Sequence, residues 1–462
     1  MRRGNRVRFY IALWLAKIAG ILLRIASKFT SMRGTNFPGE IALRICPDFI
    51  GRVSKPKTIA VVTGTNGKTT TSNLISSALE ECGYNVLSNK YGSNIKTGIA
   101  TALINGVTWS NRSTKEIALL EVDERSSVRI YPYMKPDYVI CTNLSRDTIM
   151  RNAHPYYIFN MLDTYLPDSA MMILNADDVI SSRLKEKNPR VYYGYDQQPG
   201  DPTVDTHLVN DAKVCPRCHA LLKYNYIKYD HIGNAYCPEC GYQSPKADYA
   251  VRSIDTVSGK MVMRTKEGEA EYNLISDTTF NVYNEAAVVT FLSVLGVDRE
   301  KIQKALSNVT VVDSRLREEV VDGKRISAIM SKGLTPACNA VLDYTVGQAG
   351  DKEVVLYLED KHELAASSER ITWIWDSDFE LLNDSSVKKI VVTGFRRFDF
   401  YYRLLLAGIP REKMVLVPEP KDVAEQLSTD RECAIFILND IYSVPERDLM
   451  IRMITERITK EN

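Results

Sequence analysis

Residues 58–70 read Thr-Ile-Ala-Val-Val-Thr-Gly-Thr-Asn-Gly-Lys-Thr-Thr, and they decide the fold that we expect. The first six are mostly β-branched and apolar, which predicts a short buried strand over 58–63. Gly64 ends this strand, and a helical pattern follows from Lys68 to Cys82. A strand, a glycine-containing loop and a helix in this order form a phosphate-binding loop, because backbone N–H groups and the helix N-terminus then face an anion. The stretch therefore predicts a nucleotide site.

The side chains of this loop suit ATP and a metal ion. Lys68 is expected to reach the β- and γ-phosphates, and Thr69 to bind Mg²⁺ through its hydroxyl. Glu121 ends a later apolar run and is expected to bind the same ion, directly or through water. The general pattern has another glycine where this chain has Val62, so a turn without ligand and a solvated Glu121 are the alternatives. The predicted phosphate-binding residues are Gly64, Thr65, Asn66, Gly67, Lys68, Thr69 and Thr70.

Short apolar runs that end in polar residues recur along the chain. The predicted strands are 117–122, 138–143, 171–175, 354–358, 389–393 and 434–438, and a further helix is predicted over 281–295. Continuous apolar strands separated by helices predict an α/β fold, whose parallel-rich sheet is covered on both faces. Ligands bind such sheets at the C-terminal ends of the strands, where Thr63, Glu121 and Asn175 fall.

Composition narrows the class of protein. At roughly 150 residues per domain, 462 residues correspond to about three domains. Hydrophobic residues make up 45% and charged residues 25%, as in ordinary globular proteins. With 59 basic and 57 acidic residues the net charge is +2, which argues against a general nucleic-acid-binding protein. Nine cysteines are too few for a disulfide scaffold, so we expect a reduced, cytoplasmic compartment.

Four of the cysteines form a metal-binding pattern. Cys215-Pro-Arg-Cys218 and Cys237-Pro-Glu-Cys240 stand 18 residues apart, inside a Tyr-, Cys- and Pro-rich stretch over 205–246 that we interpret as an insertion. This spacing predicts a zinc ribbon in which Cys215, Cys218, Cys237 and Cys240 bind Zn²⁺. Four thiolates leave no open coordination position, so the ion would be structural. Four reduced core cysteines are the alternative.

The N-terminus departs from the charge balance of the chain. Residues before Glu40 include eight Lys or Arg and no acidic residue, while 9–26 are mostly apolar. Lys17 and Arg24 interrupt the run, which argues against a transmembrane span. Two interpretations remain: a first helix packed into the core, and a helix that lies on an anionic membrane surface.

Together these residues resemble the Mur ligases and folylpolyglutamate synthases, which use ATP to form an acyl phosphate that an amine attacks. Residues 64–70 are similar to their phosphate loop, and Glu121 to their metal-binding Glu. Thr142-Asn-Leu-Ser-Arg-Asp147, Leu174-Asn-Ala-Asp-Asp178, Phe280-Asn-Val-Tyr-Asn284 and Ser314-Arg315 match further family segments. The resemblance implies nucleotide contacts by Asn175, Asp177, Asn281 and Asn284. It makes Arg315 a candidate catalytic residue that binds phosphate or carboxylate, with an interdomain salt bridge as the alternative.

Within that group the chain resembles the MurT family along essentially its whole length. Shared features are the basic N-terminal helix before Pro38-Gly-Glu-Ile-Ala-Leu43, the inserted four-cysteine ribbon and Trp373-Ile-Trp-Asp376. The family pairs with a GatD-type glutaminase that releases ammonia, and it amidates the α-carboxyl of D-glutamate in the lipid II stem peptide. The resemblance thus implies a heterodimer at lipid II, using ATP and Mg²⁺.

The chain departs from the family pattern in two places. After Asp147 it lacks the usual His, and His154 is displaced, so we do not predict it as a metal ligand. In the family an Asp before the Trp motif completes the partner's Cys–His triad. Here residues 359–370 do not match the family's sequence at that segment. Asp360 is the candidate to orient the partner's His, with Glu363 as the alternative. A ligase that joins another amine or amino acid to a different carboxylate therefore stays open.

These observations predict three regions. They are a basic amphipathic segment over 1–50, an ATP-binding domain over 51–310 and a C-terminal α/β domain over 311–462. A zinc-ribbon ATPase that binds nucleic acid is the alternative from another class, and the near-neutral charge disfavours it.

Overall fold

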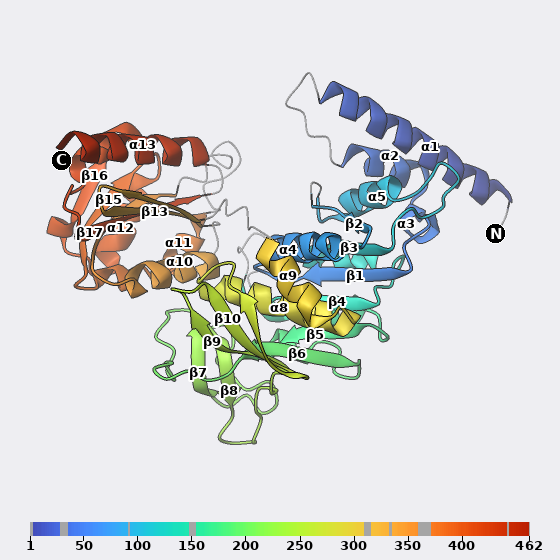
Figure 1. The fold of residues 1–462 in the computed structure, drawn as a ribbon, viewed down its shortest axis with the longest axis horizontal. Helices are drawn as coiled ribbons and strands as arrows, with labels where there is room; N and C mark the ends of the chain where they lie inside the picture. Colours follow the sequence, from blue (N-terminus) through green and yellow to red (C-terminus); the bar gives the residue numbers. More distant parts are fainter. Residues whose placement is uncertain are drawn as a thin grey trace. The chain divides into compact units, whose positions relative to one another are not determined.

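The computed structural model describes residues 3–27, 36–90, 93–146, 154–308, 316–331, 335–358, 371–440 and 443–461. The chain forms two compact units, each with its own sheet (Figure 1). Unit 1 comprises Met1–Ser145, Pro155–Val204 and Ala212–Val311, and unit 2 comprises Arg146–His154, Asp205–Asp211 and Val312–Asn462. The predicted N-terminal segment thus belongs to unit 1, and the domain boundaries drawn from the sequence stay a prediction.

The sheet of unit 1 confirms the predicted α/β class. Its described strands follow the order β11-β10-β9-β6-β5-β4-β1-β3-β2, and they are parallel from β2 to β9. Their bounds are β1 Thr58–Thr63, β2 Val86–Ser88, β3 Ile117–Glu121, β4 Tyr138–Cys141, β5 Met171–Asn175, β6 Arg190–Tyr195, β9 Tyr249–Asp255, β10 Lys260–Thr265 and β11 Gly268–Asn273. The antiparallel β9–β11 meander was not predicted, because β10 and β11 alternate buried and more exposed residues instead of forming an apolar run.

Alternate residues of the central strands enter two different cores. On β1, Ile59 and Val61 join the core under one set of helices, whereas Ala60 and Val62 join the core under another. The first set is α1 Arg3–Ala26, α2 Phe37–Ile45, α3 Phe49–Arg52, α5 Lys96–Asn105, α6 Ser127–Ile130 and α7 Pro155–Tyr165. The second set is α4 Lys68–Glu81, α8 Thr279–Leu295 and α9 Arg299–Asn308. Burial on both faces explains why these strands read as unbroken apolar runs.

A buried carboxylate ties the sheet to the hairpin that precedes the second cysteine pair. This hairpin consists of β7 Lys223–Tyr229 and β8 Ile232–Tyr236. Asp177 accepts hydrogen bonds from the hydroxyls of Tyr226 (2.7 Å) and Tyr283 (2.8 Å) and from the backbone N–H of Tyr195 (2.9 Å). Burial raises the pKa of Asp177, although these donors act in the opposite direction. The hairpin tyrosine therefore serves internal packing.

Unit 2 is a second α/β layer structure. Its described strands run in the order β12-β13-β17-β14-β15-β16, parallel except for β12. The bounds are β12 Leu316–Val321, β13 Lys324–Ser331, β14 Asp351–Tyr357, β15 Val387–Thr393, β16 Met414–Val417, β17 Cys433–Asp440, α10 Thr335–Gly347, α11 Trp373–Asp376, α12 Arg397–Leu406 and α13 Val444–Glu461. On β14, Val354 and Leu356 pack in the core with α10 and α12, while Val355 and Tyr357 pack with α13.

Residues 205–211 belong to unit 2, although the sequence placed them in the zinc insertion. His207 Nδ1 lies 2.6 Å from Asp378 Oδ2, and the backbone N–H of Leu208 donates to Asp378 Oδ1 at 2.8 Å. Asn339 Nδ2 donates to the same carboxylate at 2.5 Å. Asp378 therefore holds the segment by contacts that no local sequence pattern records.

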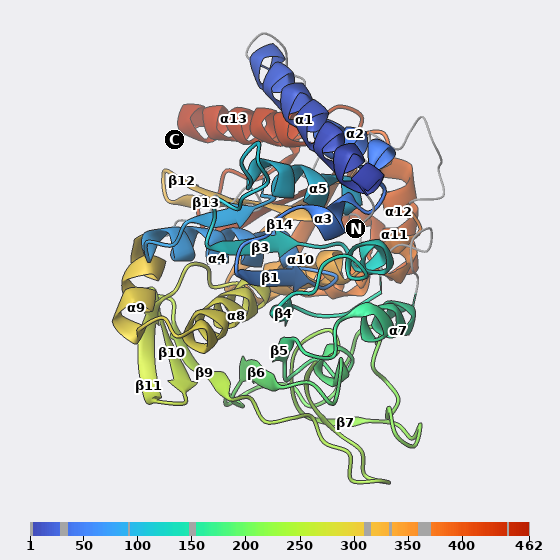
Figure 2. The ribbon, with the colours of Figure 1, turned by 90° about the vertical axis from the view of Figure 1, so that its right-hand side faces the viewer.

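Helix α1 is the outermost of a stack with α2 and α5 (Figures 1 and 2). Phe9, Leu13 and Ala16 are buried in the core of unit 1, as the core-packed interpretation predicts. Over Arg6–Ala26 the helix is also long and apolar enough to cross a membrane, by length and composition alone. Only 22% of that window is buried within the protein.

Asp177→Ala tests the buried network. The Tyr283 hydroxyl and the backbone N–H of Tyr195 would lose their acceptor, whereas the Tyr226 hydroxyl keeps Tyr195 O as an acceptor at 2.6 Å. Because each unsatisfied buried donor costs about 1–3 kcal/mol, we expect a loss of about 2 kcal/mol or more in the free energy of unfolding. The matched control is Asp196→Ala, which removes a partly exposed carboxylate paired with Arg264 and should cost about 1 kcal/mol or less. Urea unfolding of both variants gives the comparison. Equal losses would contradict the network's role.

Candidate functional site

The phosphate loop lies between β1 and α4, where the sequence predicts it. Gly64 has φ +125° and Gly67 has φ +81°, both in the region that favours glycine. A Cβ on Gly64 would overlap the Thr142 hydroxyl, and a Cβ on Gly67 would overlap Asn284 Oδ1. Both glycines are therefore required by backbone angle and by space. Val62, at the position of the missing third glycine, is a buried residue of β1.

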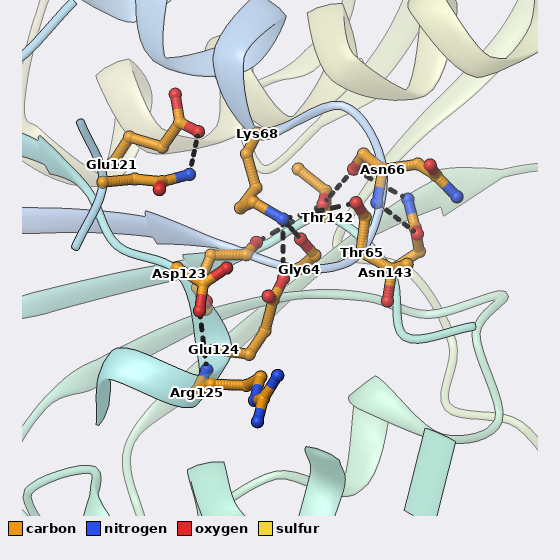
Figure 3. Close-up of polar contacts among 12 residues, drawn as sticks. Gly64, Thr65, Asn66, Lys68, Glu121, Asp123, Glu124, Arg125, Thr142 and Asn143 are labelled. Atoms are coloured by element: carbon orange, nitrogen blue, oxygen red, sulfur yellow. Dashed lines mark hydrogen bonds and ion pairs between the residues drawn. The ribbon is translucent and has the colours of Figure 1, made fainter. Parts of the chain in front are cut away.

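The segment after β4 holds the loop backbone by hydrogen bonds (Figure 3). The backbone N–H of Thr65 donates to Asn143 O at 2.8 Å, and that of Asn66 donates to Asn143 Oδ1 at 3.1 Å. Thr142 Oγ1 and Asn143 Nδ2 both donate to Asn66 O, at 2.5 and 3.1 Å. Asp178 accepts the N–H of Leu144 at 2.7 Å and so fixes this segment in turn. These bonds tie the backbone of the loop to the segment after β4.

Lys68 points inward at the start of α4 (Figure 3). Its ammonium forms an ion pair with Glu124 Oε1 at 2.7 Å and donates to the carbonyls of Gly64 and Thr65. Burial lowers the pKa of Lys68, but the acidic groups Glu124, Glu121 and Asp123 outweigh burial, and the net pKa is raised. The side chain is therefore a buried cation at the phosphate loop, and its contact with the β- and γ-phosphates stays a prediction. Glu124, its partner, was not predicted, because only Glu121 was singled out in the Glu121–Glu124 run.

Thr69 and Glu121 are brought together as the metal prediction requires. Thr69 Oγ1 lies 3.2 Å from Glu121 Oε1, so one cation could contact both oxygens. Glu121 is held by Asn94, whose amide donates to Oε1 at 2.9 Å, and by Asn89, which bonds both backbone groups of Glu121. A hydroxyl and a carboxylate beside a phosphate loop are the oxygen ligands that Mg²⁺ takes in such sites. The donor set thus fits the expected ion.

The residues predicted on the nucleotide side occupy different environments. Asn284 contacts α4, since Thr71 Oγ1 donates to its Oδ1 at 3.1 Å, and Asn284 Nδ2 donates to Asn281 Oδ1 at 3.3 Å. Asn175 is buried and donates to Thr142 O at 3.4 Å. Asp177 lies in the buried network described above. Their contacts with nucleotide stay predictions, as does any role of Thr70.

The four predicted zinc ligands converge. Their sulfur atoms all lie within 4.8 Å of one another, and the pairs Cys215–Cys240 and Cys218–Cys237 are 3.5 Å apart. Zinc–sulfur bonds of about 2.3 Å place the sulfurs of a tetrahedral site about 3.8 Å apart, so the cluster fits Zn²⁺. Each knuckle ends in a left-handed residue, His219 with φ +65° and Gly241 with φ +69°. Gly241 has no Cβ to oppose this conformation, whereas His219 adopts it despite its Cβ.

Three predicted residues fall outside the described part of the chain. Arg315, Asp360 and Glu363 lie in 309–315 and 359–370. Their roles stay predictions. Asp376, at the end of the Trp motif, lies in the described part and pairs with Arg146 at 3.4 Å.

Comparison with known proteins agrees with this geometry. Residues 62–214 match the Mur ligase middle domain, and residues 336–443 match the MurT ligase C-terminal region. The fold, the phosphate loop and its acidic partner together define a Mur-type ligase.

Curated relatives narrow the class. The lipid II isoglutaminyl synthase (glutamine-hydrolyzing) subunit MurT of Staphylococcus aureus is 33% identical over 407 residues, covering 87% of this chain and 89% of the relative. The subunit of the same name from Streptococcus pneumoniae is 30% identical and covers 86% and 87%. The chain belongs to the MurT family of Mur ligases.

A solved structure supports the fold over nearly the whole chain. The pseudomurein peptide ligase type C from Methanothermus fervidus superposes with a TM-score of 0.65 at 20% identity, covering 94% of this chain and 86% of the other. At this identity the likeness concerns the fold alone.

Lys68→Ala tests the phosphate loop. Without the ammonium, negative charge on the transferred phosphoryl group loses its buried cation, and we expect ATP-dependent phosphate release to fall about 100-fold or more. Lys266→Ala removes an exposed lysine of unit 1 and should leave the rate unchanged. The readout is phosphate release under saturating ATP and Mg²⁺. Loss of less than threefold, on the order of 0.6 kcal/mol, would contradict the assignment.

Metal analysis tests the cysteine cluster. We expect the purified chain to carry zinc, and Cys237→Ser to lower both the zinc content and the thermal midpoint, because a structural ion contributes folding free energy. Cys433→Ser, which alters a cysteine of unit 2 outside the cluster, is the control and should retain the zinc. Mass spectrometry of the metal content gives the result. A metal-free wild-type protein with unchanged stability would refute a structural ion.

Proposed function

We propose that this protein amidates the α-carboxyl of D-glutamate in the lipid II stem peptide, using ATP and ammonia released by a GatD-type glutaminase. The observation that supports this most is the match to MurT subunits over most of the chain, together with a phosphate loop where Lys68 pairs with Glu124 and Thr69 lies 3.2 Å from Glu121. The names of these relatives specify lipid II and glutamine hydrolysis. For this chain the acceptor and the nitrogen source are proposals.

The chemistry has two steps. A carboxylate is a poor electrophile, so one of its oxygens first attacks the γ-phosphorus of ATP, and ADP leaves. Ammonia then attacks the carbonyl carbon of the acyl phosphate, inorganic phosphate leaves and the nitrogen loses a proton. In the first step Lys68 stabilises charge on the transferred phosphoryl group. Thr69 and Glu121 would hold Mg²⁺, which supplies further positive charge beside the phosphates.

Unit 2 offers a surface for the glutaminase. Aromatic and aliphatic side chains lie exposed along one side of α12 and on the loop before it, and Trp375 of α11 packs edge-to-face on Tyr402. They are Trp375 (42% exposed), Phe395 (64%), Phe398 (63%), Tyr402 (57%) and Leu406 (60%). Exposed aromatic clusters of this kind are typical of protein interfaces. Residues 359–370 precede this surface in the sequence. They include Asp360, which is proposed to orient the partner's catalytic His.

The remaining parts of the proposal concern ions and location. Zn²⁺ would hold the cysteine knuckles, and Arg315 would bind phosphate or carboxylate in the second step. The enzyme would act in the cytoplasm, at the inner face of the membrane where its lipid substrate is anchored.

The test is reconstitution. The chain is produced together with the glutaminase encoded beside it, purified as a complex, and supplied with ATP, Mg²⁺, glutamine and detergent-solubilised lipid II. We expect mass spectrometry to show replacement of the carboxyl hydroxyl by an amide, dependent on both ATP and glutamine. Phe398→Glu should abolish co-purification of the glutaminase, because it places a charge in the aromatic surface.

Controls separate the parts of the proposal. Val320→Glu introduces the same charge at another exposed apolar position of unit 2 and should leave co-purification intact. ATP hydrolysis without amidation of lipid II would reject the acceptor and favour a ligase for a different carboxylate. Amidation with free ammonia but not with glutamine would reject the glutaminase partnership.

A further inference from the structure

Helix α1 has two apolar faces, and the described residues of the chain cover only one of them. Phe9, Ala12, Leu13 and Ala16 are buried in unit 1. Polar groups fix the helix in this orientation: Lys17 Nζ donates to the carbonyls of Ile104 and Val107 at 2.8 and 2.7 Å. An ordinary surface helix would turn polar residues outward on the side away from this packing.

The opposite face is a continuous apolar stripe. Its exposed members recur at intervals of three or four residues, which places them on one side of an α-helix. They are Val7 (59% exposed), Ile11 (44%), Trp14 (47%), Leu15 (46%), Ile18 (46%), Ile21 (43%), Leu22 (61%) and Ile25 (53%). Trp109, 48% exposed, extends the surface, since Trp14 Nε1 donates to its carbonyl at 3.0 Å. An uncovered apolar surface of this size marks an interaction site.

The charged residues along the edges of the stripe indicate the kind of partner that would cover it. At 100° per residue, Arg6 and Arg24 fall along one edge of the stripe and Arg8 along the other, and all three are exposed. The chain has no Asp or Glu before residue 40. An apolar face bordered by cations is complementary to an anionic bilayer, in which acyl chains meet the apolar side chains and headgroup phosphates meet the arginines. Two tryptophans beside such a face suit the headgroup boundary.

We propose that the outer face of α1 lies in the surface of an anionic membrane and holds unit 1 there. The helix lies parallel to the bilayer rather than crossing it, because Phe9, Leu13 and Lys17 stay engaged with the protein core. This inference rests on the proposed function in one respect. A lipid-anchored stem peptide is found only at a membrane, so binding there raises its concentration at the phosphate loop of the same unit.

Vesicle flotation tests the binding directly. The full-length chain is mixed with vesicles of phosphatidylcholine alone or with about one third phosphatidylglycerol, a fraction chosen to mimic an anionic leaflet. We expect flotation only with the anionic vesicles, and its loss in high salt, because screening removes the attraction to the arginines. Ile18→Glu/Leu22→Glu should weaken binding about tenfold or more. Val257→Glu, at an exposed apolar position away from α1, should bind like wild type.

A second measurement locates the contact. Tryptophan fluorescence should be quenched by lipids brominated on the acyl chain, and Trp14→Phe/Trp109→Phe should remove most of that quenching. Flotation equal for Ile18→Glu/Leu22→Glu and wild type would overturn the proposal. So would binding to neutral vesicles that is insensitive to salt. A stripe that instead mediates self-association, seen as a dimer that the double substitution dissociates without any flotation, would equally overturn it.

Activity separates this inference from the proposed function. With lipid II in detergent, Ile18→Glu/Leu22→Glu should amidate at the wild-type rate, whereas with lipid II in anionic vesicles it should be about tenfold slower. Flotation without amidation in either format would leave the membrane site standing and reject the proposed reaction. Amidation without flotation would support the proposed reaction and reject the membrane site.

Discussion

The site depends on the close approach of the phosphate loop to the segments around it. Gly64 meets the end of β4 and Gly67 meets α8 at distances that leave no room for a Cβ. This approach lets Thr142 and Asn143 hold the loop backbone by hydrogen bonds. The fold around the loop therefore holds its backbone beside the N-terminus of α4, where helix N–H groups can face an anion.

Buried charge within unit 1 is arranged in two ways. Lys68 and Glu124 form an ion pair in the site, so the cation that we expect to contact phosphate is kept charged and held in position. Asp177 is a separate buried carboxylate, and it accepts hydrogen bonds from tyrosine hydroxyls and a backbone N–H. The first arrangement leaves a group that a ligand can engage. The second satisfies its donors internally and joins the sheet to the hairpin and α8.

Surface chemistry differs between the two units in a way that fits two kinds of partner. The exposed stripe of α1 is mainly aliphatic and is bordered by Arg6, Arg8 and Arg24, whereas the exposed surface along α12 is mainly aromatic. Lipid favours the first composition, and a folded protein favours the second. Each surface leaves the core of its own unit intact, because a separate set of residues on the same helix packs inward.

The sequence by itself determined the α/β class, the central strands, the phosphate loop and the cysteine cluster, because each depends on residues close together in the chain. It also marked Thr69 and Glu121, since parallel strands bring their C-terminal ends to one edge. Only the tertiary structure decided that Glu124 pairs with Lys68, that Asp177 packs between tyrosines, and that residues 205–211 join unit 2. These contacts span from 49 to 171 residues of sequence, and no local periodicity encodes them. The structure likewise decided which apolar face of α1 packs against unit 1 and which face the described residues leave exposed. Composition alone cannot distinguish two such faces.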